Sequence, residues 1–147
     1  MNKRNSKSSL FLIELIITIL FFSLGSAVCV EAFVKAHLIS KHAKDVSFAS
    51  SQASSAASVM KYTDGSFSDF LNYYPDAAQK DTEFLVYYDK KRQPSAKKNS
   101  EYTMYVSPTI KDSMKYIEIR VDDSKKKELY SLNIHFPISG KEAADES

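Results

Sequence analysis

Residues 10–30 read LFLIELIITILFFSLGSAVCV, an apolar run that contains one charged residue, Glu14. At about 1.5 Å rise per residue, a helix of this length spans roughly 30 Å, which is the thickness of the hydrocarbon core of a bilayer. A carboxylate inside such a segment costs about 2.5–3.5 kcal/mol on insertion scales. We therefore expect one membrane-spanning helix whose buried acid has a partner.

The residues in front of this run are basic. Lys3, Arg4 and Lys7 precede it, and no acid occurs before Glu14. Because basic residues flank the cytoplasmic side of a membrane segment, this predicts an N-terminus inside and the remainder outside, in a single pass through the cytoplasmic membrane. A cleaved secretory signal is an alternative, but the apolar run is longer than the usual core of about 7–15 residues and contains Glu14. The net charge of +2 favours no acidic partner.

A single helix is expected over residues 10–62. No proline occurs before Pro75, and Gly25 is the only glycine inside this range, which makes it the predicted point for a bend. Beyond residue 30 the pattern becomes amphipathic, and Thr63-Asp64-Gly65 supplies a turn that ends the helix. The apolar stripe of this second half consists of Val46, Ala49, Ala53, Ala57 and Met60.

Four later segments carry strand signals: the first is aromatic and β-branched, and the other three alternate between two faces, as half-buried antiparallel strands do. They cover residues 84–88, 102–106, 116–121 and 129–136, with polar hairpin loops at 90–100 and 122–127 and a short helical turn near 67–71. The predicted fold is α+β, with a long N-terminal helix whose second half packs on a four-stranded antiparallel sheet. The predicted parts are a leader (1–9), a membrane helix (10–30), its amphipathic continuation (31–62), an exported sheet domain (63–138) and a disordered tail (139–147).

The start of the chain, Leu10-Phe11-Leu12-Ile13-Glu14-Leu15 after a basic leader, resembles the processing motif of type IV pilins and type II secretion pseudopilins. In that family a prepilin peptidase cuts after a small residue, the new apolar N-terminus is methylated, and a glutamate follows four residues later. The resemblance implies that Ser9 and Leu10 form the cleavage boundary, that Leu10 is the methylated residue, and that the Glu14 carboxylate pairs with the amine of a neighbouring subunit.

The chain departs from the main subunits of that family in several respects. Ser9 replaces the usual glycine, no proline lies near Glu31, and Cys29, the only cysteine, leaves no C-terminal cysteine pair. A calcium-binding loop is not evident, since Asp122 and Asp123 form a lone acidic pair. The resemblance thus implies a minor subunit of a type IV pilus, a type II secretion system or a competence-type filament. Its partners would be a prepilin peptidase and other pilins or pseudopilins, with no cofactor.

A different class of function remains open, namely an unprocessed single-pass anchor that carries an extracytoplasmic binding module. One loop is rich in basic residues, which are most simply a solvated hairpin tip but are also a candidate patch for DNA or an anionic cell-surface polymer: Lys90, Lys91, Arg92, Lys97 and Lys98. His37 and His42 are five residues apart and do not share a helix face, which argues against a metal pair. No Gly-x-Ser-x-Gly nucleophile motif occurs, so we expect no enzyme.

Overall fold

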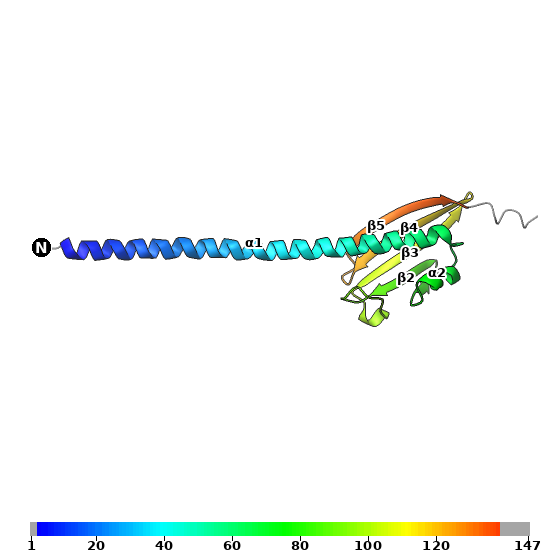
Figure 1. The fold of residues 1–147 in the computed structure, drawn as a ribbon, viewed down its shortest axis with the longest axis horizontal. Helices are drawn as coiled ribbons and strands as arrows, with labels where there is room; N and C mark the ends of the chain where they lie inside the picture. The colour runs from blue at the N-terminus through cyan, green and yellow to red at the C-terminus, as the bar shows by residue number, and fades with distance from the viewer. Residues whose placement is uncertain (1–2, 139–147) are drawn as a thin grey trace, which may run out of the picture. The chain divides into compact units, whose positions relative to one another are not determined.

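In a computed structural model, which describes residues 3–138, helix α1 runs without interruption through Lys3–Tyr62 (Figure 1). The predicted end of the helix is confirmed: the Thr63 amide still donates to the carbonyl of Val59 (3.0 Å), and Gly65 then takes a φ of +87°. A positive φ suits glycine because it has no Cβ. The predicted start at residue 10 is wrong, since α1 begins at Lys3, inside the predicted leader. The helix also passes through Gly25 without a break.

A short second helix, α2, covers Phe67–Tyr73 and confirms the predicted turn near residues 67–71. The Ser66 hydroxyl caps it by accepting from the Asp69 amide (3.2 Å), which satisfies one of the free N–H groups of the first turn. The hydroxyl and amide of Ser66 hydrogen-bond to the Asp64 carboxylate and lower the pKa of that group. The connection between α1 and α2 is therefore built from local polar contacts.

The sheet has five strands in the order β1-β2-β3-β4-β5, all antiparallel, rather than the four predicted. The additional strand, β1 (Ala78–Lys80), is exposed along its whole length and pairs with β2 through its backbone. Since it has no alternating apolar side chains, it left no period-2 signal. The other bounds are β2 (Glu83–Tyr88), β3 (Tyr102–Lys111), β4 (Met114–Asp123) and β5 (Glu128–Pro137), with a 3-10 turn η1 at Lys97–Asn99.

All four predicted strands are longer than expected, and β3 and β4 are extended the most. β3 pairs with β2 only as far as Val106 and continues along β4 to Lys111, so Pro108 lies where β3 has lost its β2 neighbour. A proline cannot donate to a ladder and is tolerated at such a position. Asp122, which was expected in a hairpin loop, belongs to β4 and is buried beside a register shift between Val121 and Asp122.

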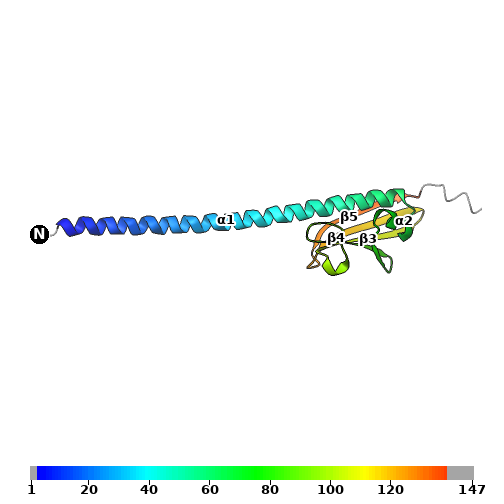
Figure 2. The same cartoon turned by 60° about the horizontal axis from the view of Figure 1, so that its bottom comes forward.

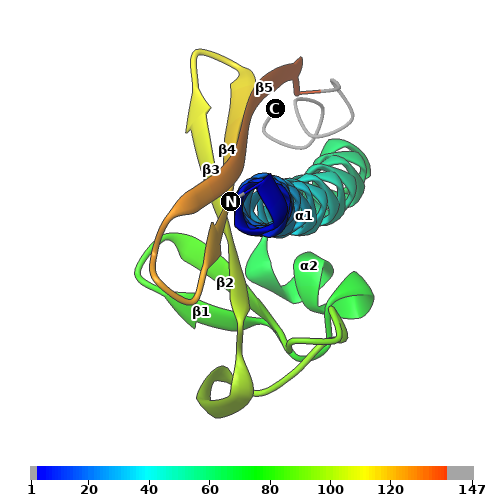
Figure 3. The ribbon, with the colours of Figure 1, turned by 90° about the vertical axis from the view of Figure 1, so that its left-hand side faces the viewer.

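The core lies between the inner face of the sheet and the second half of α1, with α2 on the same side of the sheet (Figures 2 and 3). Ala49, Ala53 and Met60 are fully buried, as the stripe predicted. Ala56 replaces Ala57 in that stripe, and Val46 and Ala57 are only half-buried. Small side chains on α1 allow the helix backbone to approach the sheet closely. On the sheet, the core includes Met104, Val106, Ile117, Ile119 and Val121.

The chain divides into two compact units, and the boundary falls inside α1 between Ala43 and Lys44. The first unit contains the apolar helical segment, and the second contains the helix half that covers the sheet together with the sheet itself. The predicted start of the sheet domain at residue 63 coincides with the end of the helix. The compact unit that contains the sheet begins earlier, at Lys44, because the last part of α1 packs on the sheet. The predicted disordered tail, residues 139–147, lies outside the described residues.

Candidate functional site

The apolar segment of the first unit is exposed along its whole length. Residues 10–30 are all exposed within this chain, and Leu10, Phe21 and Phe22 keep 64, 70 and 75% of their surface accessible. The helix is long and apolar enough to cross a membrane, a property that membrane anchors share with signal sequences near an N-terminus. An exposed apolar surface of this size indicates a lipid or protein environment for this segment.

The polar side chains of the segment differ in how they are satisfied. The hydroxyls of Thr18, Ser23 and Ser26 each donate to a backbone carbonyl four residues earlier, at 2.8–2.9 Å. Such bonds within a helix allow serine and threonine to enter an apolar environment. The carboxylate of Glu14 makes no ion pair or hydrogen bond with the described residues. Glu14 therefore differs from these hydroxyl groups, whose hydrogen bonds are made within the helix.

The predicted processing residues lie within one stretch of α1. Ser9 and Leu10 are both helical, so the predicted cleavage boundary is inside the helix rather than before it. Leu10 and Glu14 are four residues apart and therefore share a face of α1. A new amine at Leu10 would thus lie about one helical turn from the carboxylate of Glu14.

The residues of the predicted basic patch are divided between a turn after β2 and the 3-10 turn η1. Arg92 donates from Nη2 to Oδ1 of Asp45 (2.9 Å), so its charge is partnered. Lys90 and Lys91 are exposed in the adjacent turn, whereas Lys97 and Lys98 lie on η1. Binding of an anionic polymer by these residues stays a prediction.

Asp45 anchors that loop to α1. Its Oδ1 accepts from Arg92 and from the hydroxyl of Tyr102 (2.8 Å), and the residue is 9% exposed. The hydrogen bond with Asp45 raises the pKa of Arg92. Burial, followed by the same carboxylate, raises the pKa of Tyr102 to about 12. The sequence analysis did not identify this cluster. Asp45 lies four residues before Ala49 and therefore on the predicted apolar face of the helix, where an acid indicates a buried partner.

Lys115 closes the end of α1. It is 7% exposed on the inner face of β4, and its Nζ donates to the carbonyls of Met60 (3.1 Å) and Thr63. A cation at the C-terminus of a helix satisfies carbonyls that lack partners and interacts favourably with the helix dipole. Sequence reasoning missed this contact too. Lys115 alternates with Ile117 and Ile119 on the apolar face of the strand, and a lysine at such a position indicates a buried hydrogen-bond partner.

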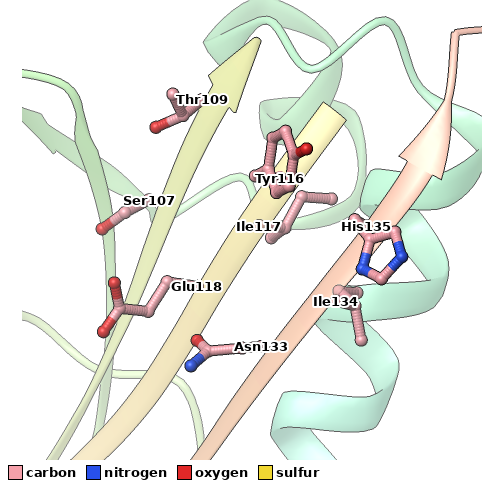
Figure 4. A pocket seen from close by; sticks show the side chains of 8 residues that line it. All are labelled: Ser107, Thr109, Tyr116, Ile117, Glu118, Asn133, Ile134 and His135. Carbon is pink, nitrogen blue, oxygen red and sulfur yellow. The ribbon is translucent and has the colours of Figure 1, made fainter. Parts of the chain in front are cut away.

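The outer face of the sheet, opposite α1, is polar and carries shallow depressions. One of ≈ 280 Å³, called here the outer-face pocket, lies over β3, β4 and β5 (Figure 4). A second, larger depression of ≈ 790 Å³ lies over β2 and β3, and its charged residues are of both signs. The outer-face pocket is lined by Ser107, Thr109, Tyr116, Ile117, Glu118, Asn133, Ile134 and His135.

Among residues 7–138, no group of three or more His, Cys, Asp or Glu side chains is placed to hold a metal ion. His37 and His42 are exposed on α1, and Cys29 is exposed in the apolar segment. The architecture of the chain is pilin-like. The first half of its long N-terminal helix is apolar, and the second half of the same helix packs on an antiparallel sheet. Comparison of the chain with protein-family models, with curated proteins and with solved structures finds no match.

Proposed function

We propose that this chain is a minor pilin-like or pseudopilin-like subunit, held in the membrane by residues 10–30, processed after Ser9 and assembled with other pilins through that segment. The observation that carries the proposal is the two-part character of α1. One half is apolar and wholly exposed, and the other is buried on a sheet, within one unbroken helix. A plain anchor does not require such continuity, whereas a subunit that packs by its helix does.

The physical role of Glu14 follows from what processing would create. A free amine at Leu10 would place a positive charge at a helix N-terminus, where the helix dipole disfavours it. In an apolar environment both this amine and the Glu14 carboxylate are costly when unpaired. Pairing of the two between neighbouring subunits removes both costs and fixes the axial position of each subunit. Van der Waals packing of the surrounding Leu, Ile and Phe side chains then holds the helices together.

The first experiment is the intact mass of the membrane-extracted protein, expressed with and without a prepilin peptidase. The expected product lacks Met1–Ser9 and carries one methyl group on Leu10. Ser9→Gly restores the usual residue before the cut and should be processed at least as fast, whereas Ser9→Phe should stay uncut. An unchanged wild-type mass in cells that process Ser9→Gly would show that this chain is not a substrate and would overturn the proposal.

The second experiment asks whether Glu14 acts in assembly. Glu14→Gln is expected to insert and to be cleaved normally, but to be lost from sheared or secreted filaments. Thr18→Val is the matched control. Thr18 lies one helical turn beyond Glu14 on the same face, and its replacement by valine also removes a polar group. Filament incorporation of Glu14→Gln at the wild-type level would contradict the pairing role.

The second candidate function is a membrane-anchored binding module that is never processed. The observation that favours it is the polar, pocketed outer face of the sheet, which neither α1 nor α2 covers. In that case ligand binding by the sheet unit would be indifferent to Ser9, Leu10 and Glu14. The mass measurement separates the two functions, because only the first requires removal of the leader.

A further inference from the structure

The outer-face pocket is built on a rigid frame. In the β4–β5 ladder Tyr116 is directly opposite His135, and Glu118 is directly opposite Asn133. Opposed side chains in an antiparallel pair have Cβ atoms about 4.5–5.5 Å apart, so these four side chains form a compact square. The rings of Tyr116 and His135 have centroids 6.0 Å apart and are tilted by 31° (Figure 4). Continuous strand pairing fixes this arrangement before any ligand arrives, which lowers the entropic cost of binding.

The polar groups of the pocket have unused hydrogen-bonding capacity. The side chains of Glu118, Asn133 and His135 make no hydrogen bond within the described residues. A carboxylate only accepts, an amide both donates and accepts, and an imidazole offers one or two N–H donors. Thr109 adds a hydroxyl from β3, and Ser107 already donates to Glu83 (3.2 Å). Donors and acceptors from three adjacent strands thus surround one exposed aromatic ring, that of Tyr116 (45% exposed).

The charge of the pocket restricts the class of ligand. Glu118 is the one acid among the lining residues, and no lysine or arginine is present there. Binding of nucleic acid or another polyanion draws on clustered Lys and Arg, so this pocket disfavours it. A wholly apolar ligand would desolvate Glu118 and Asn133 without replacing their hydrogen bonds to water. An uncharged ligand with many hydroxyls and one apolar face meets both conditions, and a sugar ring has that character.

The size and surroundings of the pocket fit more than a single sugar. A volume of ≈ 280 Å³ is just below the range for small-ligand sites, about 300–1,000 Å³. A neighbouring depression of ≈ 160 Å³ shares Ser107 and Glu118 with it. That depression also contains Tyr105, whose ring lies 4.6 Å from the guanidinium carbon of Arg120. Because they share these two lining residues, the two depressions adjoin one another, and an elongated ligand that binds in one would reach the other.

We propose that the outer face of β3–β5 binds a neutral oligosaccharide. The Tyr116 ring packs against the C–H face of one sugar, and Glu118 accepts hydrogen bonds from its hydroxyls. Asn133 and His135 fix the orientation of that sugar, and the depression beside Arg120 receives the next one. The proposal does not depend on processing at Ser9, since no residue of the pocket belongs to α1.

The test uses the full chain in micelles of a detergent without a sugar headgroup, because a maltoside or glucoside would compete for the site. Saturation-transfer NMR and titration calorimetry are run with di- to tetrasaccharides of glucose, galactose and N-acetylglucosamine. Saturable binding by at least one of these is expected, with at least tenfold weaker affinity in Tyr116→Ala and in Glu118→Gln. Tyr73→Ala is the matched control, since Tyr73 is an exposed tyrosine on α2 (61% exposed), and it should bind as wild type does.

Each other outcome overturns the proposal. If no saccharide in the panel binds, or if Tyr116→Ala and Tyr73→Ala bind equally well, the pocket is not the site. If a polyanion such as heparin binds more tightly than the saccharides, and Glu118→Gln increases its affinity, the ligand of the pocket is an anionic polymer. If extended peptides bind and saccharides do not, the face is a protein-docking surface. Unchanged thermal unfolding of Tyr116→Ala and Glu118→Gln confirms that lost binding does not reflect lost folding, which the exposure of both side chains leads us to expect.

Discussion

At the scale of single residues, the second unit depends on a few charged side chains that reach across long stretches of sequence. Asp45 holds Arg92 and Tyr102, while Lys115 holds the last carbonyls of α1. Asp45, Tyr102 and Lys115 are buried, whereas the side chain of Arg92 keeps 35% of its surface accessible. Removal of a partner therefore leaves a buried group desolvated and unsatisfied. These residues therefore carry larger expected effects than the exposed lysines of the loops.

Lys115→Met should destabilise the protein by about 1–3 kcal/mol, since hydrogen bonds from a charged donor are lost at the end of α1 while the aliphatic stem is kept. Chemical denaturation of the full chain in micelles, followed by near-ultraviolet circular dichroism, measures this. Lys111→Met is the matched control, because Lys111 is exposed on the same β3–β4 hairpin. Equal unfolding midpoints for the two variants would show that the contacts of Lys115 contribute nothing to stability.

Alkaline pH should destabilise the fold through Tyr102. Burial and Asp45 raise its pKa to about 12 in the folded protein, whereas an unfolded tyrosine has a pKa of about 10. Between these two pH values the unfolded state binds fewer protons than the folded state. The contribution of Tyr102 to stability is therefore fully present below about pH 10 and is lost as the pH rises toward 12. Unfolding midpoints at about pH 8 and about pH 11 test this. Tyr102→Phe should show a smaller fall than wild type, and Tyr73→Phe the same fall. An equal fall in Tyr102→Phe would exclude Tyr102 as the cause.

At the scale of elements, the close approach of α1 to the sheet depends on small residues. Ala49, Ala53 and Ala56 are fully buried against strands that carry larger side chains. The helix contributes little volume to the core, and the sheet supplies the rest through Met104, Ile117 and Ile119. This division explains why a segment composed almost wholly of serine and alanine forms a packed helix rather than a linker.

Ala53→Leu should destabilise the second unit by about 1–3 kcal/mol or more, because it inserts extra carbon atoms into a well-packed interface. Ser55→Leu is the matched control, since Ser55 is exposed two residues further along the same helix. Leucine is the better helix former of the two residue types, so Ser55→Leu should be neutral or slightly stabilising. Thermal unfolding of both variants provides the measurement. Tolerance of Ala53→Leu would mean that the helix and the sheet are less closely packed than the structure has them.

At the scale of the whole molecule, the two units differ in what they require from outside. All residues of the hydrophobic core lie between Ala49 and Val121, within the second unit. In the first unit, residues 7–43 form one exposed stretch of helix, and none of them is buried in a core. The second unit therefore has what an independent domain needs, and the first needs a bilayer or other helices.

A fragment comprising residues 44–147 should accordingly be soluble and unfold cooperatively without detergent. Its unfolding midpoint should agree with that of the sheet unit in the full chain, because the contacts that form the core are all retained. Circular dichroism and size-exclusion chromatography of the fragment measure this. An unfolded or aggregated fragment would show that the first half of α1 contributes to the folding of the sheet unit.

The sequence by itself determined the elements whose signal is local. The apolar run, the end of α1 at Thr63-Asp64-Gly65, the short helix before Pro75 and four strands all follow from spacings of a few residues. Helical and strand periodicity are properties of neighbouring residues, so they can be read without knowledge of the fold.

Only the tertiary structure decided the features that join distant residues. β1 exists because its backbone pairs with β2, the Arg92 charge is neutralised by an acid 47 positions away, and Lys115 caps a helix that ends more than fifty residues earlier. The outer-face pocket likewise needs the registers of β3, β4 and β5 together. Local patterns do not specify such contacts, because each depends on which surfaces the chain brings into proximity when its apolar faces are buried.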